Sequence, residues 1–203
     1  MKRMILCVIL AASLTVIALV PKSHAAKSPI GRGSRIVDGA ITFDSKGGEF
    51  YEDENGKRES EWRLYPSGGY FVRDNVAVSL ILEIASIKQG NFLDQIWAVG
   101  PGARYYFGGG RNSSGTYYFV GGAYLFGQYI NDSGVADEQR QNYTLQSLNL
   151  DAGLTYMLSE AVGATISVFY DLSWVKQKEP EEGDSWVDGN DLGFKFGFTT
   201  FLF

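Results

Sequence analysis

The chain has 203 residues, of which 45% are hydrophobic and 14% aromatic, and its formal net charge is −5. This acidic balance disfavours a nucleic-acid partner, because phosphate backbones attract clusters of Lys and Arg. The only Cys and the only His, Cys7 and His24, lie near the N-terminus. A chain that loses this segment can form no disulfide, no structural zinc site and no Ser-His or Cys-His nucleophile.

The N-terminal segment has the pattern of a secretory signal peptide. Lys2 and Arg3 precede an apolar run over residues 4–20, and small residues follow at Ala25 and Ala26. We therefore expect residues 1–25 to be removed and residues 26–203 to form one domain. With Lys2, Arg3 and Lys22 taken from the 18 basic residues, 15 remain against 23 acidic ones, a mature net charge of −8. No later apolar run reaches the ~18 residues of a helical membrane span.

The first half of the mature chain predicts strands separated by polar connections. Residues 36–43 form the first predicted strand, although its pattern does not show which side faces outward. A hydrophilic loop over 46–60 precedes a second strand at 61–71, which alternates Trp62 and Leu64 with polar residues. Because Pro66 cannot donate a ladder hydrogen bond, we expect a bulge there.

The next two strands are predicted at 76–84 and 94–107, after a tight turn over 72–75 and a break near 88–91. In the fourth strand the odd-numbered positions, such as Trp97 and Tyr105, are predicted to face outward. The Gly-rich residues 108–115 are interpreted as a turn. A phosphate cradle is disfavoured because no helical pattern follows them.

The second half completes the pattern. A fifth strand at 117–129 and a loop at 131–142 precede a hairpin over 148–174, in which apolar residues occupy every second position on both arms. An acidic loop follows at 176–190, and residues 192–203 form the eighth strand. These strands exceed the ~5–6 residues usual in soluble sheets and approach the ~9–11 of a tilted transmembrane strand. The predicted fold class is all-β, an eight-stranded antiparallel up-and-down transmembrane β-barrel.

The last strand and the connections between strands carry further signals. Phe194, Phe196 and Phe198 share one parity in the last strand, whereas Phe201 and Phe203 have the other. Either a bulge lies at 199–200 or the final residues face inward.

Connections near 52, 90, 136 and 183 are mostly long and charged, so they are predicted to be extracellular. The shorter connections near 73, 111 and 160 are predicted to be periplasmic. A periplasmic aromatic girdle is predicted from Tyr70, Phe71, Tyr105, Phe107, Tyr117, Phe119, Tyr156, Phe201 and Phe203.

Three stretches, at 66–78, 100–107 and 201–203, resemble the small outer-membrane β-barrel family with OmpA- and OmpX-like architecture. The resemblance spans the mature chain and implies a Gram-negative outer membrane, with lipid and lipopolysaccharide around the barrel. It also implies that the barrel-assembly machinery recognises the terminal aromatic residues, Phe201 and Phe203. It carries over no catalytic residue.

Six charged residues fall at positions predicted to face the lumen: Arg63, Glu83, Arg104, Asp151, Asp171 and Lys195. A pair of buried acids can serve general acid-base catalysis. We favour a structural ion network, because an unpaired charge sealed inside a barrel costs several kcal/mol. A loop centred near residue 183 places Asp171 opposite Lys195, and we expect these two to form an ion pair. A turn centred at 160 places Asp151 opposite residue 169, diagonally near Asp171, where it should share Lys195.

These features predict a structural or surface-interaction barrel that acts on an unknown ligand through charged extracellular loops. The alternative is a narrow channel or a conduit for hydrophobic ligands. An outer-membrane lipid-modifying enzyme is less favoured, because barrels with that activity resemble Ser/His-dependent enzymes and the mature chain lacks His. We predict no cofactor and no metal site, since the acidic residues Glu181, Glu182, Asp184 and Asp188 do not have the spacing of an EF-hand loop.

Overall fold

A computed structural model describes residues 28–46, 59–89, 92–108, 115–132, 141–177 and 186–203. The predicted signal peptide and most of the predicted extracellular loop residues lie outside these ranges. Within them, no helix is long and apolar enough to cross a membrane.

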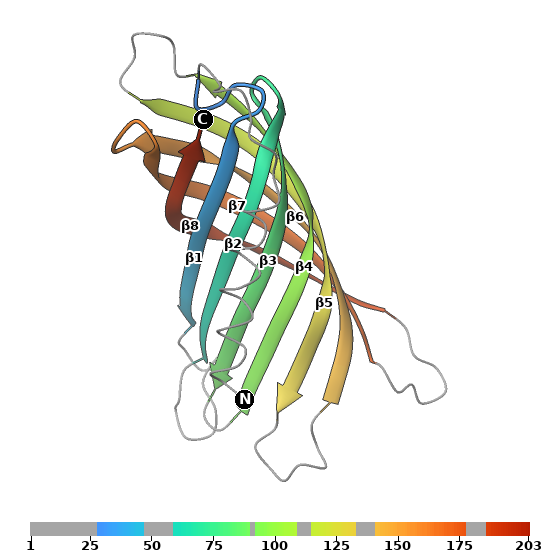
Figure 1. The fold of residues 1–203 in the computed structure, drawn as a ribbon. Helices are drawn as coiled ribbons and strands as arrows, with labels where there is room; N and C mark the ends of the chain where they lie inside the picture. The colour runs from blue at the N-terminus through green and yellow to red at the C-terminus, as the bar shows by residue number, and fades with distance from the viewer. Residues whose placement is uncertain (1–27, 47–58, 90–91, 109–114, 133–140, 178–185) are drawn as a thin grey trace, which may run out of the picture.

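The described residues form one closed sheet of eight antiparallel strands, as predicted (Figure 1). Each strand pairs with its neighbours in the sequence, and the first strand pairs with the last. The strands are β1 (Arg35–Lys46), β2 (Glu59–Arg73), β3 (Val76–Gln89), β4 (Phe92–Gly108), β5 (Thr116–Asp132), β6 (Gln141–Met157), β7 (Val162–Gln177) and β8 (Val187–Leu202). Most strands extend beyond their predicted bounds, because residues beyond the apolar alternation remain paired.

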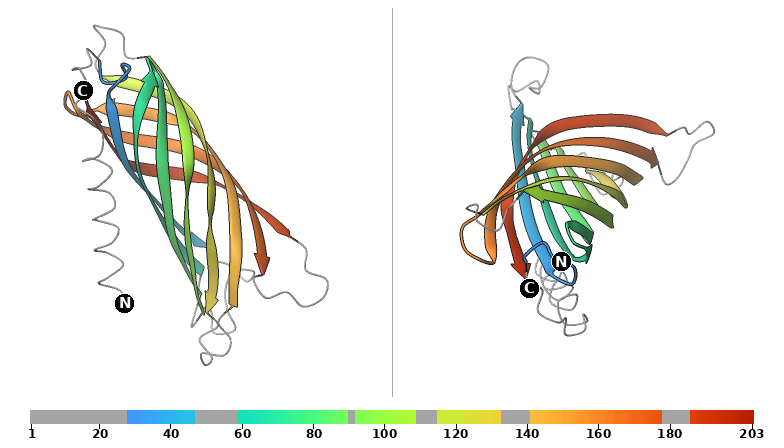
Figure 2. Two further views of the ribbon diagram at one scale, coloured as in Figure 1. Left: turned by 45° about the vertical axis from the view of Figure 1, so that its right-hand side comes forward. Right: turned by 90° about the horizontal axis from the view of Figure 1, so that it is seen from above.

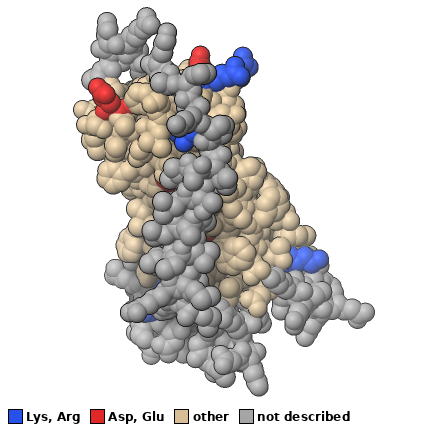
Figure 3. Space-filling model, in the orientation of Figure 1, with Lys and Arg blue, Asp and Glu red and all other residues tan. Residues whose placement is uncertain are grey.

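Side chains alternate between the two faces of the barrel wall. In mid-strand, Leu80 of β3 and Phe196 of β8 are 51% and 54% exposed on the outside, whereas Tyr106 of β4 is completely buried inside. In β1, Ile36 is buried and Phe43 is exposed, which settles the parity that its sequence left open. The face drawn in Figure 3 shows few described charges between the two ends of the barrel. An apolar outside of this kind is the surface that a transmembrane barrel presents to lipid.

The bulge predicted at Pro66 is wrong. The β2–β3 ladder keeps one register from Leu64 opposite Ile84 to Ser67 opposite Ile81, although Tyr65 and Pro66 between them form no pair with β3. The missing N–H therefore leaves a gap in the ladder without adding a residue. The register shifts instead between Phe71 and Arg73, beside the tight turn, where Asn75 has a φ of 71°.

The register of the last strand is continuous. β7 and β8 pair without interruption from Val162 opposite Thr200 to Val175 opposite Val187, so no bulge lies at Thr199 and Thr200. The second alternative therefore holds for Phe201, which faces inward and is completely buried. Phe203 follows the end of β8 and is 45% exposed.

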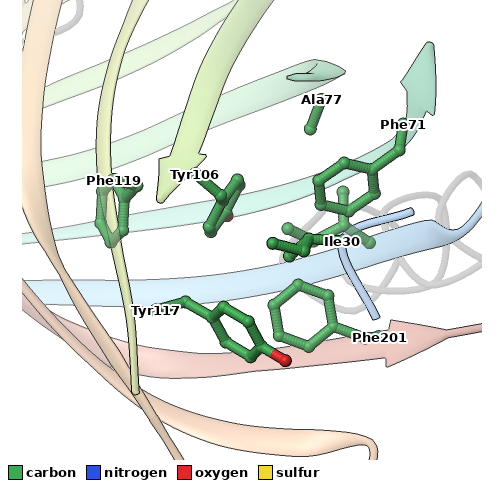
Figure 4. Packing of buried hydrophobic residues seen from close by; sticks show 8 residues of the cluster. Ile30, Phe71, Ala77, Tyr106, Tyr117, Phe119 and Phe201 are labelled. Carbon is green, nitrogen blue, oxygen red and sulfur yellow. The ribbon is translucent and has the colours of Figure 1, made fainter. Parts of the chain in front are cut away.

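An aromatic plug fills the lumen at the end that holds the short turns and the C-terminus (Figure 4). We define it as the buried cluster Ile30, Ile36, Phe71, Ala77, Tyr106, Tyr117, Phe119 and Phe201. The girdle prediction is consequently wrong for four residues, Phe71, Tyr117, Phe119 and Phe201, which point inside. The other five, Tyr70, Tyr105, Phe107, Tyr156 and Phe203, are exposed. Nearness to one end of the barrel was apparent from the sequence, but parity decides which aromatic residues can reach lipid.

The segment before β1 caps this plug. Residues 28–34 carry Ile30 into the lumen, and their backbone is tied to the β2–β3 turn. The Gly33 N–H donates to the Phe71 carbonyl, the Phe71 N–H donates to Ser34, and the Asn75 N–H donates to Ile30. The sequence offered no signal for this cap, because the segment has neither periodicity nor length.

The junction of β1 and β8, which we call the seam, is paired over only part of its length. The pairs run from Arg35 opposite Leu202 to Ile41 opposite Phe196. β1 nevertheless continues beside β2 to Lys46, and β8 begins beside β7 at Val187. Figure 2 shows β7 and β8 diverging from β1 toward the loop end. Among the described residues, the seam is therefore paired near the C-terminus, from Arg35 to Ile41 of β1, and unpaired toward the loop end.

Candidate functional site: the charged lumen

Arg63 is the centre of the first charged cluster. It projects inward from β2 and its guanidinium pairs with Glu61, two residues away on the same face of the strand. Its nitrogens lie 3.5 Å from Glu83 of β3, 3.8 Å from Asp171 of β7 and 3.1 Å from Asp191 of β8. One side chain thus bridges strands on both sides of the seam. The Asp171 carboxylate also accepts hydrogen bonds from the hydroxyl of Ser147 and the hydroxyl of Ser173.

Arg104 is the centre of a second cluster, nearer the aromatic plug. Its Nη1 donates to Asp38 of β1 at 2.6 Å, and its Nη2 donates to Asp151 of β6 at 2.8 Å. The guanidinium also lies 4.7 Å from the ring centroid of Phe119 in the plug. The fork of a guanidinium suits two carboxylates at once, so Arg104 ties β4 to strands on both sides of the lumen.

Lys195 does not pair with Asp171, and that part of the prediction is wrong. Lys195 lies opposite Ser167, whereas Asp171 lies opposite Asp191. The loop between β7 and β8 is centred on residue 181, as the pair Val175 and Val187 shows, and not on residue 183 as predicted. Because of this error of two residues in the loop centre, the residue opposite each position of β7 lies four residues earlier in β8 than predicted. The prediction that Asp151 lies opposite residue 169 is confirmed. The prediction that Asp151 shares Lys195 is wrong, because Asp151 pairs with Arg104 and Lys195 donates to Asn149.

Lys195 is held by neutral groups. Its Nζ donates to the Asn149 side chain at 2.8 Å and lies 4.0 Å and 4.7 Å from the ring centroids of Tyr65 and Phe169. Aromatic faces stabilise a cation through their quadrupole, most strongly where water is excluded. Lys195 is 4% exposed, so these contacts replace much of its hydration shell.

A chain of hydroxyl groups crosses three neighbouring strands nearer the end with the short turns. Thr155 of β6 and Thr165 of β7 lie 2.9 Å apart, and Thr165 and Thr199 of β8 lie 2.8 Å apart, measured between their Oγ1 atoms. Thr155 and Thr199 are almost completely buried. Their hydroxyls satisfy one another inside the wall, where an unpaired hydroxyl is costly.

The structure places the six predicted lumen charges in two ion clusters and one cation held by rings. Arg63, Glu83 and Asp171 meet in the first cluster, Arg104 and Asp151 meet in the second, and Lys195 lies against the rings of Tyr65 and Phe169.

Sequence reasoning missed Asp38, Glu61, Asp191 and Asn149. Asp38 was missed because the parity of its strand was open, and Asp191 because the eighth strand was predicted to begin one residue later. Among the described residues, Arg63 and Arg104 pair with six carboxylates, those of Asp38, Glu61, Glu83, Asp151, Asp171 and Asp191.

Little space remains between these groups. A cavity of about 30 Å³ lies inside the wall, and its lining includes Asp38, Arg104, Asn149, Asp151 and Lys195. That volume holds about two or three water molecules, at ~10–15 Å³ each on this measure. Among the described residues, no group of three or more His, Cys, Asp or Glu is arranged to hold a metal ion. Between the charged groups of the described residues, this cavity is too small for a substrate.

The closed sheet, its alternating faces and its filled lumen define the class of fold, the small eight-stranded outer-membrane β-barrel of the OmpA and OmpX type. One solved structure similar to this chain is the N-terminal β-barrel domain of Pseudomonas aeruginosa OprF, at 18% identity and a TM-score of 0.51. That alignment covers 85% of this chain and 99% of the other. Neisserial surface protein A is also similar, with 14% identity, a TM-score of 0.49, and coverage of 84% of this chain and 96% of that one. No family model and no curated protein matches the sequence.

Proposed function

We propose that the protein is a non-conducting barrel of the bacterial outer membrane that acts through its charged extracellular loops. The observation that carries this proposal is the filled lumen. The aromatic plug closes one end, two ion clusters and Lys195 cross the middle, and a cavity of about 30 Å³ is left between them. An interior filled in this way supports a barrel without a continuous water path.

The location and assembly route form part of the same proposal. The signal peptide at residues 1–25 directs export, and residues 26–203 insert into the outer membrane among lipid and lipopolysaccharide. The barrel-assembly machinery recognises the terminal aromatic residues. Since Phe201 is buried in the plug of the folded barrel, only Phe203 of the two stays accessible after folding.

The loop residues supply the chemistry for contacts outside the cell. The predicted loop around residues 47–58 mixes both signs of charge, and the one around 178–185 is acidic. Such segments suit a polar or cationic surface ligand and keep the exposed end of the barrel hydrated. A catalytic role has little support, because the mature chain lacks His and Cys and the described lumen carboxylates lie in contact with cations or hydroxyls.

Planar-bilayer conductance of the refolded mature protein tests the absence of a pore. We expect no steady conductance for the wild type. The double variant Phe71→Ala with Phe201→Ala, which removes two rings of the plug, serves as a control that the assay detects an opened lumen. Steady and sizeable wild-type conductance would establish the narrow channel instead.

The loop part of the proposal needs a separate measurement. Residues 178–185 are replaced by Gly and Ser at the same length, and assembly is checked by heat-modifiable migration on a gel. We expect an unchanged barrel yield and reduced adhesion of intact cells to other cells and surfaces. Unchanged adhesion after replacing this loop and the one at 47–58 would contradict a role for the loops.

A further inference from the structure

The internal cavity reaches the inner face of the seam. Its lining includes Asp38 of β1 and both Lys195 and Thr199 of β8, the two strands that close the barrel. Asp38 lies directly opposite Thr199 in the β1–β8 ladder. Lys195 is buried on the same inner face, four residues earlier in β8. The cavity therefore joins polar groups that belong to both strands of the seam.

Asp38 has an unused hydrogen-bond acceptor at this cavity. Its Oδ2 accepts a hydrogen bond from Arg104, whereas its Oδ1 is buried and has no hydrogen-bond partner within the described residues. The Asp38 side chain is only 10% exposed, so bulk solvent does not hydrate this oxygen freely. Buried polar atoms in native proteins nearly always have a partner, which is either protein or ordered water. Oδ1 therefore needs a donor that can reach it through the cavity.

Unused donors lie on the opposite side of the seam. Two hydrogen bonds join the three hydroxyl groups of Thr155, Thr165 and Thr199, so one O–H of this chain still needs an acceptor. Thr199 is the end of the chain that lines the cavity, and Thr155 is the end that does not. The Lys195 ammonium has three N–H groups, and among the described residues only the Asn149 side chain accepts a hydrogen bond from it. Donors without acceptors thus face the same space as an acceptor without a donor.

The volume and the charge of the cavity identify the ligand as water. About 30 Å³ is enough for two or three water molecules and for nothing larger. The charged side chains of the lining balance, because the two cations Arg104 and Lys195 stand against the two carboxylates Asp38 and Asp151. A balanced site does not call for a counter-ion. Water both donates and accepts, as the mixture of unused groups requires.

We propose that this cavity is a binding site for two or three ordered water molecules, which connect Asp38 of β1 with Thr199 and Lys195 of β8. The waters donate to Asp38 Oδ1 and accept from the hydroxyl and the ammonium group. They tie the two seam strands together from the inside, next to the point where backbone pairing ends at Ile41 opposite Phe196. The cluster is confined to the cavity, so the inference does not depend on the extracellular loops or on conductance.

A crystal structure of the refolded mature barrel, at a resolution that shows ordered water, tests the proposal. We expect two or three density peaks in the cavity, one of them within about 2.5–3.2 Å of Asp38 Oδ1. A second crystal is soaked in rubidium bromide, because anomalous scattering distinguishes both of these ions from water. A cavity without ordered density would overturn the proposal. An anomalous peak in the cavity would also overturn it, by showing that the site takes an ion.

Thr199→Val and Thr155→Val form a matched pair of variants. Each substitution nearly keeps the shape of the side chain and removes one end of the same hydroxyl chain, and both residues are almost completely buried. Heat-modifiable migration on a gel confirms that each variant is folded. We expect the crystal structure of Thr199→Val to lose the water beside position 199, whereas that of Thr155→Val keeps every water of the wild type. Loss of a water in both variants, or in neither, would contradict the link between Thr199 and Asp38.

Discussion

Replacing Arg63 by Met removes the cation of the first lumen cluster while keeping an unbranched apolar stem. Glu83 and Asp171 are 3% and 5% exposed, and Arg63 is their only ion-pair partner within the described residues. The pair with Asp191 contributes little, since that carboxylate is 44% exposed and screened by water. Breaking a buried ion pair by removing one partner costs about 3–5 kcal/mol, because the other charge is left uncompensated.

We therefore expect Arg63→Met to lower the free energy of unfolding by about 3–5 kcal/mol. Adding Glu83→Gln should restore part of the lost free energy of unfolding, because it removes one of the two carboxylates that no longer have a cation beside them. Lys88→Met is the control, since Lys88 is an exposed cation on β3, and surface charges of this kind contribute about 0–1 kcal/mol.

Urea unfolding in lipid vesicles, followed by tryptophan fluorescence, measures all of these variants. The reasoning is refuted if Arg63→Met loses no more than Lys88→Met. It is refuted equally if the losses of Arg63→Met and Glu83→Gln simply add, because two groups in contact must show an interaction free energy.

Three further predictions concern the plug, the outer face and assembly. Phe201→Ala should cost about 3–5 kcal/mol in the same unfolding assay, since it empties the centre of the plug; a loss below about 1 kcal/mol would show that the plug is loosely packed. Ile166→Arg should cost about 2–4 kcal/mol in a bilayer, whereas Thr155→Ser keeps its hydroxyl inside the wall and should be nearly silent; equal effects would contradict the two faces. Deleting Phe203 should reduce membrane yield in cells while the refolded protein keeps its stability, and an unchanged yield would exclude Phe203 as an assembly signal.

Two-residue periodicity was enough to predict the strands and most of their faces, with the first strand and four inward aromatic residues as the exceptions. Each predicted strand lies within or close to an observed one, because an apolar outside and a packed inside impose alternation on every residue of a barrel wall. Trp97 and Arg104, seven residues apart, were assigned to opposite faces by counting alone. Strand ends were underestimated where the alternation fades but pairing continues, as at Gln89.

Register across a loop was harder to predict, because it depends on where the chain turns. The tight turn near residue 160 leaves little freedom, and the partner of Asp151 was predicted correctly. The acidic loop near residue 183 is longer, and an error of two residues in its centre separated Lys195 from Asp171. Contacts that cross the lumen, such as Arg63 with Asp191 or Arg104 with Asp38, depend on barrel closure and have no signal in any local pattern.

Spin-label accessibility along β7 tests the central claim, that one face of the wall meets lipid and the other a filled lumen. Single Cys residues are introduced at positions 164–171 of the mature chain, which has no other Cys. We predict that collisions with oxygen, which partitions into hydrocarbon, are frequent at even positions such as Ile166 and rare at odd ones such as Ser167. A water-soluble nickel chelate should reach neither set. A flat oxygen profile, or nickel access at the odd positions, would contradict a lipid-facing wall around a closed interior.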